Sequence, residues 1–227
     1  DANKLIEEFM LLANRTVAEK IGRVPKGKKA KVLPYRIHDL PDPEKLDNLA
    51  QFIARFGYKL RTSGTKTDIS KSINHLLDDI QGKKEENLIE TVSIRAMQKA
   101  RYSVHNVGHY GLAFDYYTHF TSPIRRYPDL AIHRIMTAQL KGMDKDTMVL
   151  RYSDFAEKAS KQSSEREIIA MQIERKAEDC YKAEYARRHL GECYEGRISG
   201  VTQRGLFIEL ENGVEGFVPA SSLTPSG

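Results

Sequence analysis

The sequence has few of the features that define a disulfide-rich, metal-thiolate or membrane-embedded protein. It contains only two cysteines, Cys180 and Cys193, and no Cys-x-x-Cys pair. Thiols this sparse indicate reduced side chains in a cytoplasmic protein rather than a disulfide framework or a zinc site. No apolar run approaches the roughly 20 residues that a membrane-spanning helix needs, so we expect no membrane partner.

A secretory signal is also missing, because the first residues are acidic and amphipathic instead of basic and then apolar. The chain begins at Asp1 in what reads as the middle of a helix, and it has no initiator methionine. We therefore expect it to be cut from a longer polypeptide.

The composition is that of a soluble globular protein. Of the 227 residues, 40% are apolar and 30% are charged, which suits one large domain or one domain with part of another. The net charge of +5 is compatible with polyanion binding, although many basic proteins bind no nucleic acid.

Helical periodicity dominates the first 190 residues. Apolar spacing predicts a helix over residues 3–21, with Gly22 as its stop signal. Asp42-Pro43-Glu44 offers an N-cap, a proline at the first helical position and an early acid. The other expected elements are a solvated turn at 26–31, a strand at 32–38, a turn at 61–67, and helices at 43–56, 68–80, 84–100, 128–140 and 152–190.

After Gly191 the periodicity changes to that of short strands. We predict strands at Cys193–Ser199, Leu206–Leu210 and Val214–Val218, which are punctuated by glycines. The chain is therefore expected to be an α+β protein with a second, all-β unit.

Residues 101–125 break the helical pattern and are rich in His, Tyr, Gly and Phe. The run Tyr117–Asp129, which begins within this segment and is called the signature run below, combines two arginines, hydroxyl groups and aromatic rings ahead of a helix. These are the parts of a site for single-stranded nucleic acid, because arginine matches phosphate and aromatic rings stack on bases. The other interpretation is a buried aromatic loop whose arginines pair with Asp115 and Asp129, and composition alone favours it.

The order of residues in this run resembles the signature of the ribonuclease R/II family, Tyr-x-His-Phe-Thr-Ser-Pro-Ile-Arg-Arg-Tyr-Pro-Asp. Further segments resemble other landmarks of the same family in the same order. They are Ile6–Asn14, Tyr35–His38 with Asp42–Glu44, Ile173–Arg175 with Lys182–Tyr185, and Gly191–Leu223, which is similar to an RNA-binding OB-type domain.

The resemblance implies a fold and two domains. Residues 1–190 would be the C-terminal part of an RNB exoribonuclease catalytic domain. Residues 191–227 would be the first strands of an incomplete OB-fold RNA-binding domain. The expected fold class is α+β, mostly helical and followed by a truncated OB-type β-barrel. The open edge of that barrel would pack against the helical part, pair with another chain or be poorly ordered. Apolar surface exposed on an incomplete catalytic domain would favour self-association.

The resemblance also implies an activity. Family members degrade single-stranded RNA processively and hydrolytically from the 3′ end, release nucleoside 5′-monophosphates, and use Mg²⁺ held by aspartates. By motif position, Arg125 and Glu174 would be catalytic, and either Glu7 or Glu8 would read the ribose near the 3′ end. The full set of implied RNA-binding residues is Glu7, Glu8, Asn14, Tyr117, His119, Thr121, Ser122, Arg126, Arg204 and Phe207. Without the resemblance, Glu7, Glu8 and Glu174 would read as solvated helix acids.

Two departures qualify what the resemblance implies. The family's aspartate cluster does not occur in these residues, so we expect no Mg²⁺ ligands in this chain and no hydrolysis by the chain alone. A non-catalytic RNA-binding relative or scaffold is the alternative. In the β unit, Arg204 replaces a residue that is often aromatic and Pro219 one that is often histidine, which weakens base stacking. His105, His109 and His119 lack the flanking spacing of a metal site.

Overall fold

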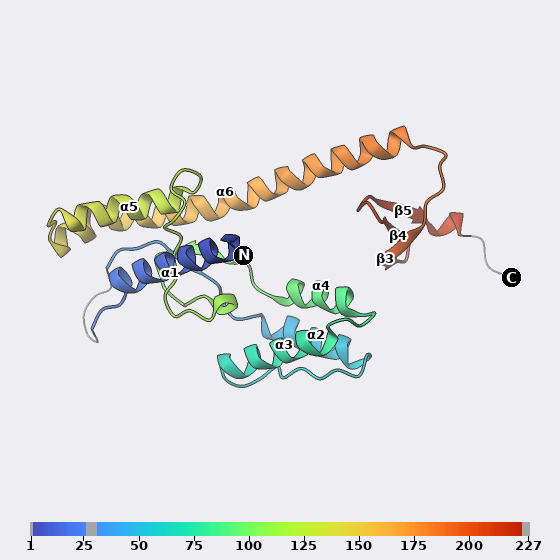
Figure 1. The fold of residues 1–227 in the computed structure, drawn as a ribbon, viewed down its shortest axis with the longest axis horizontal. Helices are drawn as coiled ribbons and strands as arrows, with labels where there is room; N and C mark the ends of the chain where they lie inside the picture. Colours follow the sequence, from blue (N-terminus) through green and yellow to red (C-terminus); the bar gives the residue numbers. More distant parts are fainter. Residues whose placement is uncertain (1, 26–30, 224–227) are drawn as a thin grey trace. The chain divides into compact units, whose positions relative to one another are not determined.

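The computed structural model describes residues 2–25 and 31–223 and divides the chain into two compact units, Asp1–Arg166 and Glu167–Gly227. Figure 1 shows the elements of both units, which are described separately here. Most of the turn expected at residues 26–31 lies outside the described residues, as does Asp1.

The core beneath the signature run joins three segments of the first unit. Helix α1 (Ala2–Gly22) packs its last turns, through Ala18 and Ile21, against residues 33–37 and Ile132. Gly22 ends the helix as expected, and its backbone touches the ring of Tyr35 so closely that a Cβ atom would collide with it. Burial raises the pKa of Tyr35 to about 12.

Three helices form a second core in the same unit. They are α2 (Pro43–Ala54), α3 (Lys66–Ile80) and α4 (Glu86–Ala96), which bury a shared apolar interior. Asp42 caps α2 as predicted, since its side chain accepts a hydrogen bond from the backbone N–H of Glu44. Thr65 and Asp68 form a capping box at the start of α3. The helix therefore begins at Lys66, within the turn that the sequence predicted at residues 61–67.

A small two-stranded sheet adjoins the first of these cores. Strand β1 (Tyr35–Ile37) pairs antiparallel with β2 (Arg101–Ser103), with Arg36 opposite Tyr102. On its other side, β1 donates from the Arg36 N–H to the Tyr117 carbonyl. The single-turn helix η1 (Tyr110–Leu112) precedes this contact. The signature run is thus attached to the sheet edge.

Two long helices complete the first unit. Helix α5 (Tyr127–Leu140) follows the signature run directly, and it packs along the first turns of α6 (Lys145–Arg188) through Ile135, Ala138, Met148 and Ala156 (Figure 1). The second unit contains the rest of α6 and a three-stranded antiparallel sheet. Its strands are β3 (Gly196–Thr202), β4 (Gly205–Leu210) and β5 (Glu215–Pro219), followed by η2 (Ala220–Ser222).

The expected fold class is confirmed: the chain is mostly helical, and its described strands form two small sheets without closing a barrel. Several bounds needed correction. The first strand is three residues long, β2 was missed, and the last helix is continuous from Lys145. Asp144 explains that early start, because its carboxylate accepts from the N–H and hydroxyl of Thr147. No helix in the described part of the chain combines the length and apolar character that a membrane crossing requires.

Candidate active site

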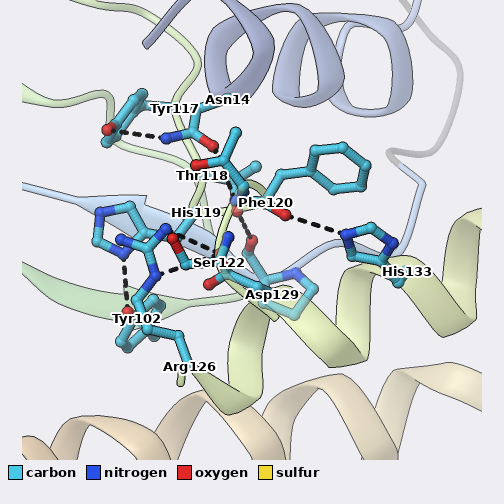
Figure 2. Close-up of polar contacts among 12 residues, drawn as sticks. Asn14, Tyr102, Tyr117, Thr118, His119, Phe120, Ser122, Arg126, Asp129 and His133 are labelled. Carbon is cyan, nitrogen blue, oxygen red and sulfur yellow. Dashed lines mark hydrogen bonds and ion pairs between the residues drawn. The ribbon is translucent and has the colours of Figure 1, made fainter. Parts of the chain in front are cut away.

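The signature run is held between α1 and α5 by one buried side chain. Asn14, on α1, is 3% exposed. Its Oδ1 accepts from the backbone N–H groups of Phe120 at 2.8 Å and Thr121 at 3.2 Å, and its Nδ2 donates to the Tyr117 hydroxyl at 3.3 Å (Figure 2). On the strand side, the Thr118 hydroxyl donates to the Pro34 carbonyl at 2.6 Å. The run is therefore anchored at both flanks.

A turn closed by Asp129 presents the arginines. The fully buried Asp129 carboxylate accepts from the Ser122 N–H at 2.8 Å and from Arg126 Nε and Nη2 at 3.2 and 2.9 Å (Figure 2). By motif position Arg126 is either a neighbouring phosphate contact or part of a structural ion pair, and the structure contains the ion pair. The pairing expected for Asp129 is present, whereas neither Arg125 nor Arg126 forms an ion pair with Asp115 among the described residues.

Arg125 differs from its neighbour. Its side chain is exposed, and it makes no hydrogen bond or ion pair with any residue that the structure describes. Ile124 beside it is fully exposed as well. The turn between Ser122 and Asp129 therefore points an unpaired guanidinium outward while Arg126 holds the turn in place. A planar fork of free donors suits a phosphate group.

Aromatic and imidazole rings line the inner side of the run. The Tyr117 ring lies 5.2 Å from His109 and 5.6 Å from His119, edge to face in both cases. The Tyr102 hydroxyl is hydrogen-bonded to His119 Nδ1 at 2.8 Å. Tyr117 is only 5% exposed, and in this structure its ring packs inside the loop. Its predicted stacking on RNA stays a prediction, as does the predicted RNA contact of the buried Asn14.

Burial and nearby cationic side chains keep two histidines beside Tyr117 uncharged. Burial, followed by the charges of Arg126 and Arg36, lowers the pKa of His119 to about 3. Burial and the neighbouring His38 lower the pKa of His109 to about 4. Both imidazoles are therefore neutral near pH 7, and the fixed positive charge of the site comes from arginine. Such a field attracts anions.

The structure separates the two glutamates that the sequence left open. A pocket of about 260 Å³ runs along α1, and its lining includes Glu7, Asn14, Tyr117 and Arg126 but not Glu8. Both glutamates are exposed on the helix, yet only Glu7 faces this pocket beside the signature run. Glu7 is thus positioned to accept a hydrogen bond from a ligand held near Arg126.

Other predicted residues lie apart from this cluster or have incomplete contacts. The Thr121 hydroxyl is buried and has no hydrogen-bond partner among the described residues. Glu174 is an exposed residue of α6 within the second unit. Arg204 is exposed in the turn between β3 and β4, and Phe207 pairs with Phe217 on the opposing strand at 5.0 Å between ring centroids. The sequence did not single out Phe217, because only the register between β4 and β5 places it opposite Phe207.

The site residues do not fit a magnesium centre. Among residues 2–25 and 31–223, no three His, Cys, Asp or Glu side chains come together as metal ligands. Asp129 Oδ1 accepts from Arg126 and from the Ser122 N–H, while the buried Oδ2 has no hydrogen-bond partner among the described residues. His119 is hydrogen-bonded to Tyr102, and His109 packs against the ring of Tyr117. What the arrangement offers chemically is charge stabilisation and hydrogen bonding from arginine and glutamate.

Comparison with known proteins places these features in a family. Residues 1–142 match the RNB domain, and residues 189–226 match the S1 RNA binding domain. The chain is 41% identical over 225 residues to "Ribonuclease R" of Aquifex aeolicus and 42% identical over 224 residues to "Ribonuclease R 1" of Lactococcus lactis subsp. lactis. These matches cover 98% of the chain but only 30% and 26% of the relatives.

A solved structure shows the same fold. The "Mycoplasma genitalium RNase R in complex with ribose methylated single-stranded RNA" superposes with a TM-score of 0.83 at 28% identity, covering 98% of this chain and 34% of that one. The RNB match spans most of the first unit, including α1, the signature run and α5. The chain therefore belongs to the RNB family, the family of ribonuclease R.

Proposed function

We propose that the protein is a processive 3′→5′ exoribonuclease of the cytoplasm that hydrolyses single-stranded RNA to nucleoside 5′-monophosphates. This chain supplies the arginine-bearing wall of the RNA site. One observation carries the proposal: Arg125 is exposed and unpaired beside the buried Arg126–Asp129 pair, in a run anchored by Asn14. The ribonuclease R relatives and the RNA-bound structural neighbour support it.

Arg125 would act on the scissile phosphate. Its guanidinium donates to the non-bridging oxygens and offsets the charge that develops on them as the bond to the leaving oxygen breaks. Arg126 and Asp129 keep the turn in position, so that this charge is in place before the substrate arrives. Glu7 accepts from the 2′-hydroxyl, which DNA lacks. In this proposal Glu174 is a further acid of the catalytic channel, and Arg204 and Phe207 contact the strand in the S1 segment.

The proposal assigns Mg²⁺ to carboxylates outside this sequence, since no described cluster holds a metal. The 227-residue chain alone is then expected to bind RNA without hydrolysing it. Incubation with Mg²⁺ and a 3′-labelled oligoribonucleotide tests this expectation. Robust trimming from the 3′ end would show that the chain is active and would refute its assigned inactivity.

Binding experiments test the assigned residues. Removing one charge-assisted contact of about 1.5–3 kcal/mol weakens binding roughly tenfold or more. Arg125→Ala should therefore raise the Kd for single-stranded RNA at least tenfold in fluorescence anisotropy. Arg55→Ala, which replaces an exposed arginine after α2, should leave the Kd unchanged.

Glu7→Gln should reduce the preference for RNA over DNA, with Glu8→Gln as the matched control. Equal effects of the two glutamine variants would remove Glu7 from its assigned function.

A non-catalytic RNA-binding relative or scaffold is the second candidate, favoured by the lack of a metal-ligand cluster among the described residues. The coding sequence upstream of Asp1 separates the two candidates. An aspartate cluster encoded there supports the enzyme, and its absence supports the scaffold.

A further inference from the structure

A second basic surface lies on α5, away from the turn that carries Arg125. A groove of about 700 Å³ follows Arg134, Thr137 and Lys141 and is closed on its other side by Arg151 and Tyr152 of α6. Residues 134, 137 and 141 recur at intervals of three and four, so they form one stripe along the helix. We call this surface the α5 groove.

The charge of the α5 groove is uncompensated. Arg134, Lys141 and Arg151 are exposed, and none of them makes an ion pair with a residue in the described ranges. No carboxylate lines the groove. The neighbouring acids of α6 are engaged elsewhere or face away. Asp154 pairs with Lys158 at 2.8 Å, and Asp146 is not part of the lining. Three like charges around one concave surface focus a positive potential there.

The groove also offers rings. Tyr152 is half-buried, and the Cζ atom of Arg151 lies over its ring, 5.8 Å from the centroid of the Tyr152 ring. His133 lines the groove and stacks on Phe120 of the signature run, with ring centroids 4.1 Å apart and planes within 6°. Its Nε2 is also hydrogen-bonded to the Phe120 carbonyl at 3.0 Å (Figure 2). The groove therefore adjoins the loop that carries Arg125.

We propose that the α5 groove is a second RNA-binding site, which holds the phosphate backbone of a single strand outside the site around Arg125. The inference rests on the proposed function for its ligand. Arg134 and Lys141 are seven residues apart, about 10 Å along the helix axis, so they contact separate phosphates of an extended strand. Positive grooves with flanking rings are how proteins bind single strands without reading sequence.

The test compares two triple variants of the 227-residue chain that lose the same charge. One is Arg134→Gln, Lys141→Gln, Arg151→Gln, in the groove. The other is Lys45→Gln, Arg55→Gln, Lys71→Gln, at exposed positions in or next to α2 and α3. The affinity for a fluorescein-labelled single-stranded oligoribonucleotide is measured over a series of KCl concentrations.

For a single strand, each phosphate contact contributes about 0.7 to the magnitude of the slope of log K against log salt. The slope of the groove variant, which lacks three such contacts, should therefore be shallower than that of wild type by about 2. The control variant should keep the wild-type slope. Equal slopes for both variants would overturn the proposal.

Arg125→Ala distinguishes failure of this inference from failure of the proposed function. If the groove variant matches wild type while Arg125→Ala weakens binding, the groove alone is refuted. If the groove variant weakens binding while Arg125→Ala does not, the groove stands and the function assigned to Arg125 falls. Circular dichroism of each variant confirms that these exposed substitutions leave the fold intact.

Discussion

A single amide, that of Asn14, satisfies two backbone N–H groups in the signature run. Replacing it with alanine leaves these groups unsatisfied in a part-buried position, at a cost of about 2 kcal/mol. We predict that Asn14→Ala lowers the free energy of unfolding by about that amount and removes the hydrogen-exchange protection of the Phe120 and Thr121 amides. Asn74→Ala, at an exposed position on α3, is the control. Unchanged protection at both amides would contradict the anchoring role.

The half-buried imidazoles of His109 and His119 predict a pH dependence of stability. In the folded chain the pKa values of His119 and His109 are lowered to about 3 and about 4, whereas an unfolded histidine titrates near 6.5. As pH falls below about 6.5, the unfolded chain binds protons that the folded chain does not, so stability decreases towards acid. Above that pH the two residues add no pH dependence.

We therefore predict a lower urea midpoint at pH 5 than at pH 7. The difference should shrink in His119→Gln and persist in His105→Gln, where an exposed histidine of the same segment is replaced. A midpoint that is higher at pH 5 than at pH 7 in the wild type would contradict the neutral state of the half-buried His119.

At the scale of elements, α1 is amphipathic, with its last turns packed in the core and a solvent-facing apolar stripe near its start. Leu5, Ile6, Phe9 and Leu12 are 58–63% exposed. A contiguous apolar patch on a helix favours association. We predict that sedimentation velocity will show concentration-dependent self-association, which Phe9→Glu with Leu12→Glu will abolish and Ile94→Glu on α4 will not. A wild-type chain that stays monomeric at every concentration would contradict this prediction.

The elements also show where sequence reasoning succeeds. The cap at Asp42 and the stop at Gly22 were predictable because both depend on residues adjacent in sequence. Strand β2 was not predictable, because three residues pair with a strand more than 60 positions away and carry no period of their own. The register between β1 and β2 therefore depends on tertiary packing between segments that are distant in sequence.

At the scale of the molecule, the chain divides after Arg166, within α6. The first unit contains the four clusters of buried apolar residues. A unit with its own core is expected to fold alone. We predict that the first unit unfolds at the same urea midpoint in a chain that ends at Arg166 as in the whole chain. Circular dichroism over a urea series measures both midpoints. A markedly lower midpoint would show that the second unit stabilises the first.

The amino-acid sequence by itself determined the family, the helices and the candidate arginines, because ordered motifs, helical periodicity and caps are local properties of the chain. Only the tertiary structure decided which of two adjacent residues lines the pocket and which forms the buried ion pair. Glu7 and Glu8 point about 100° apart on a helix, and only the packing of α1 against the signature run brings Glu7 to the pocket. Likewise Arg126 pairs with Asp129 and Arg125 does not, because the turn closed at Ser122 points one guanidinium inward and the next outward.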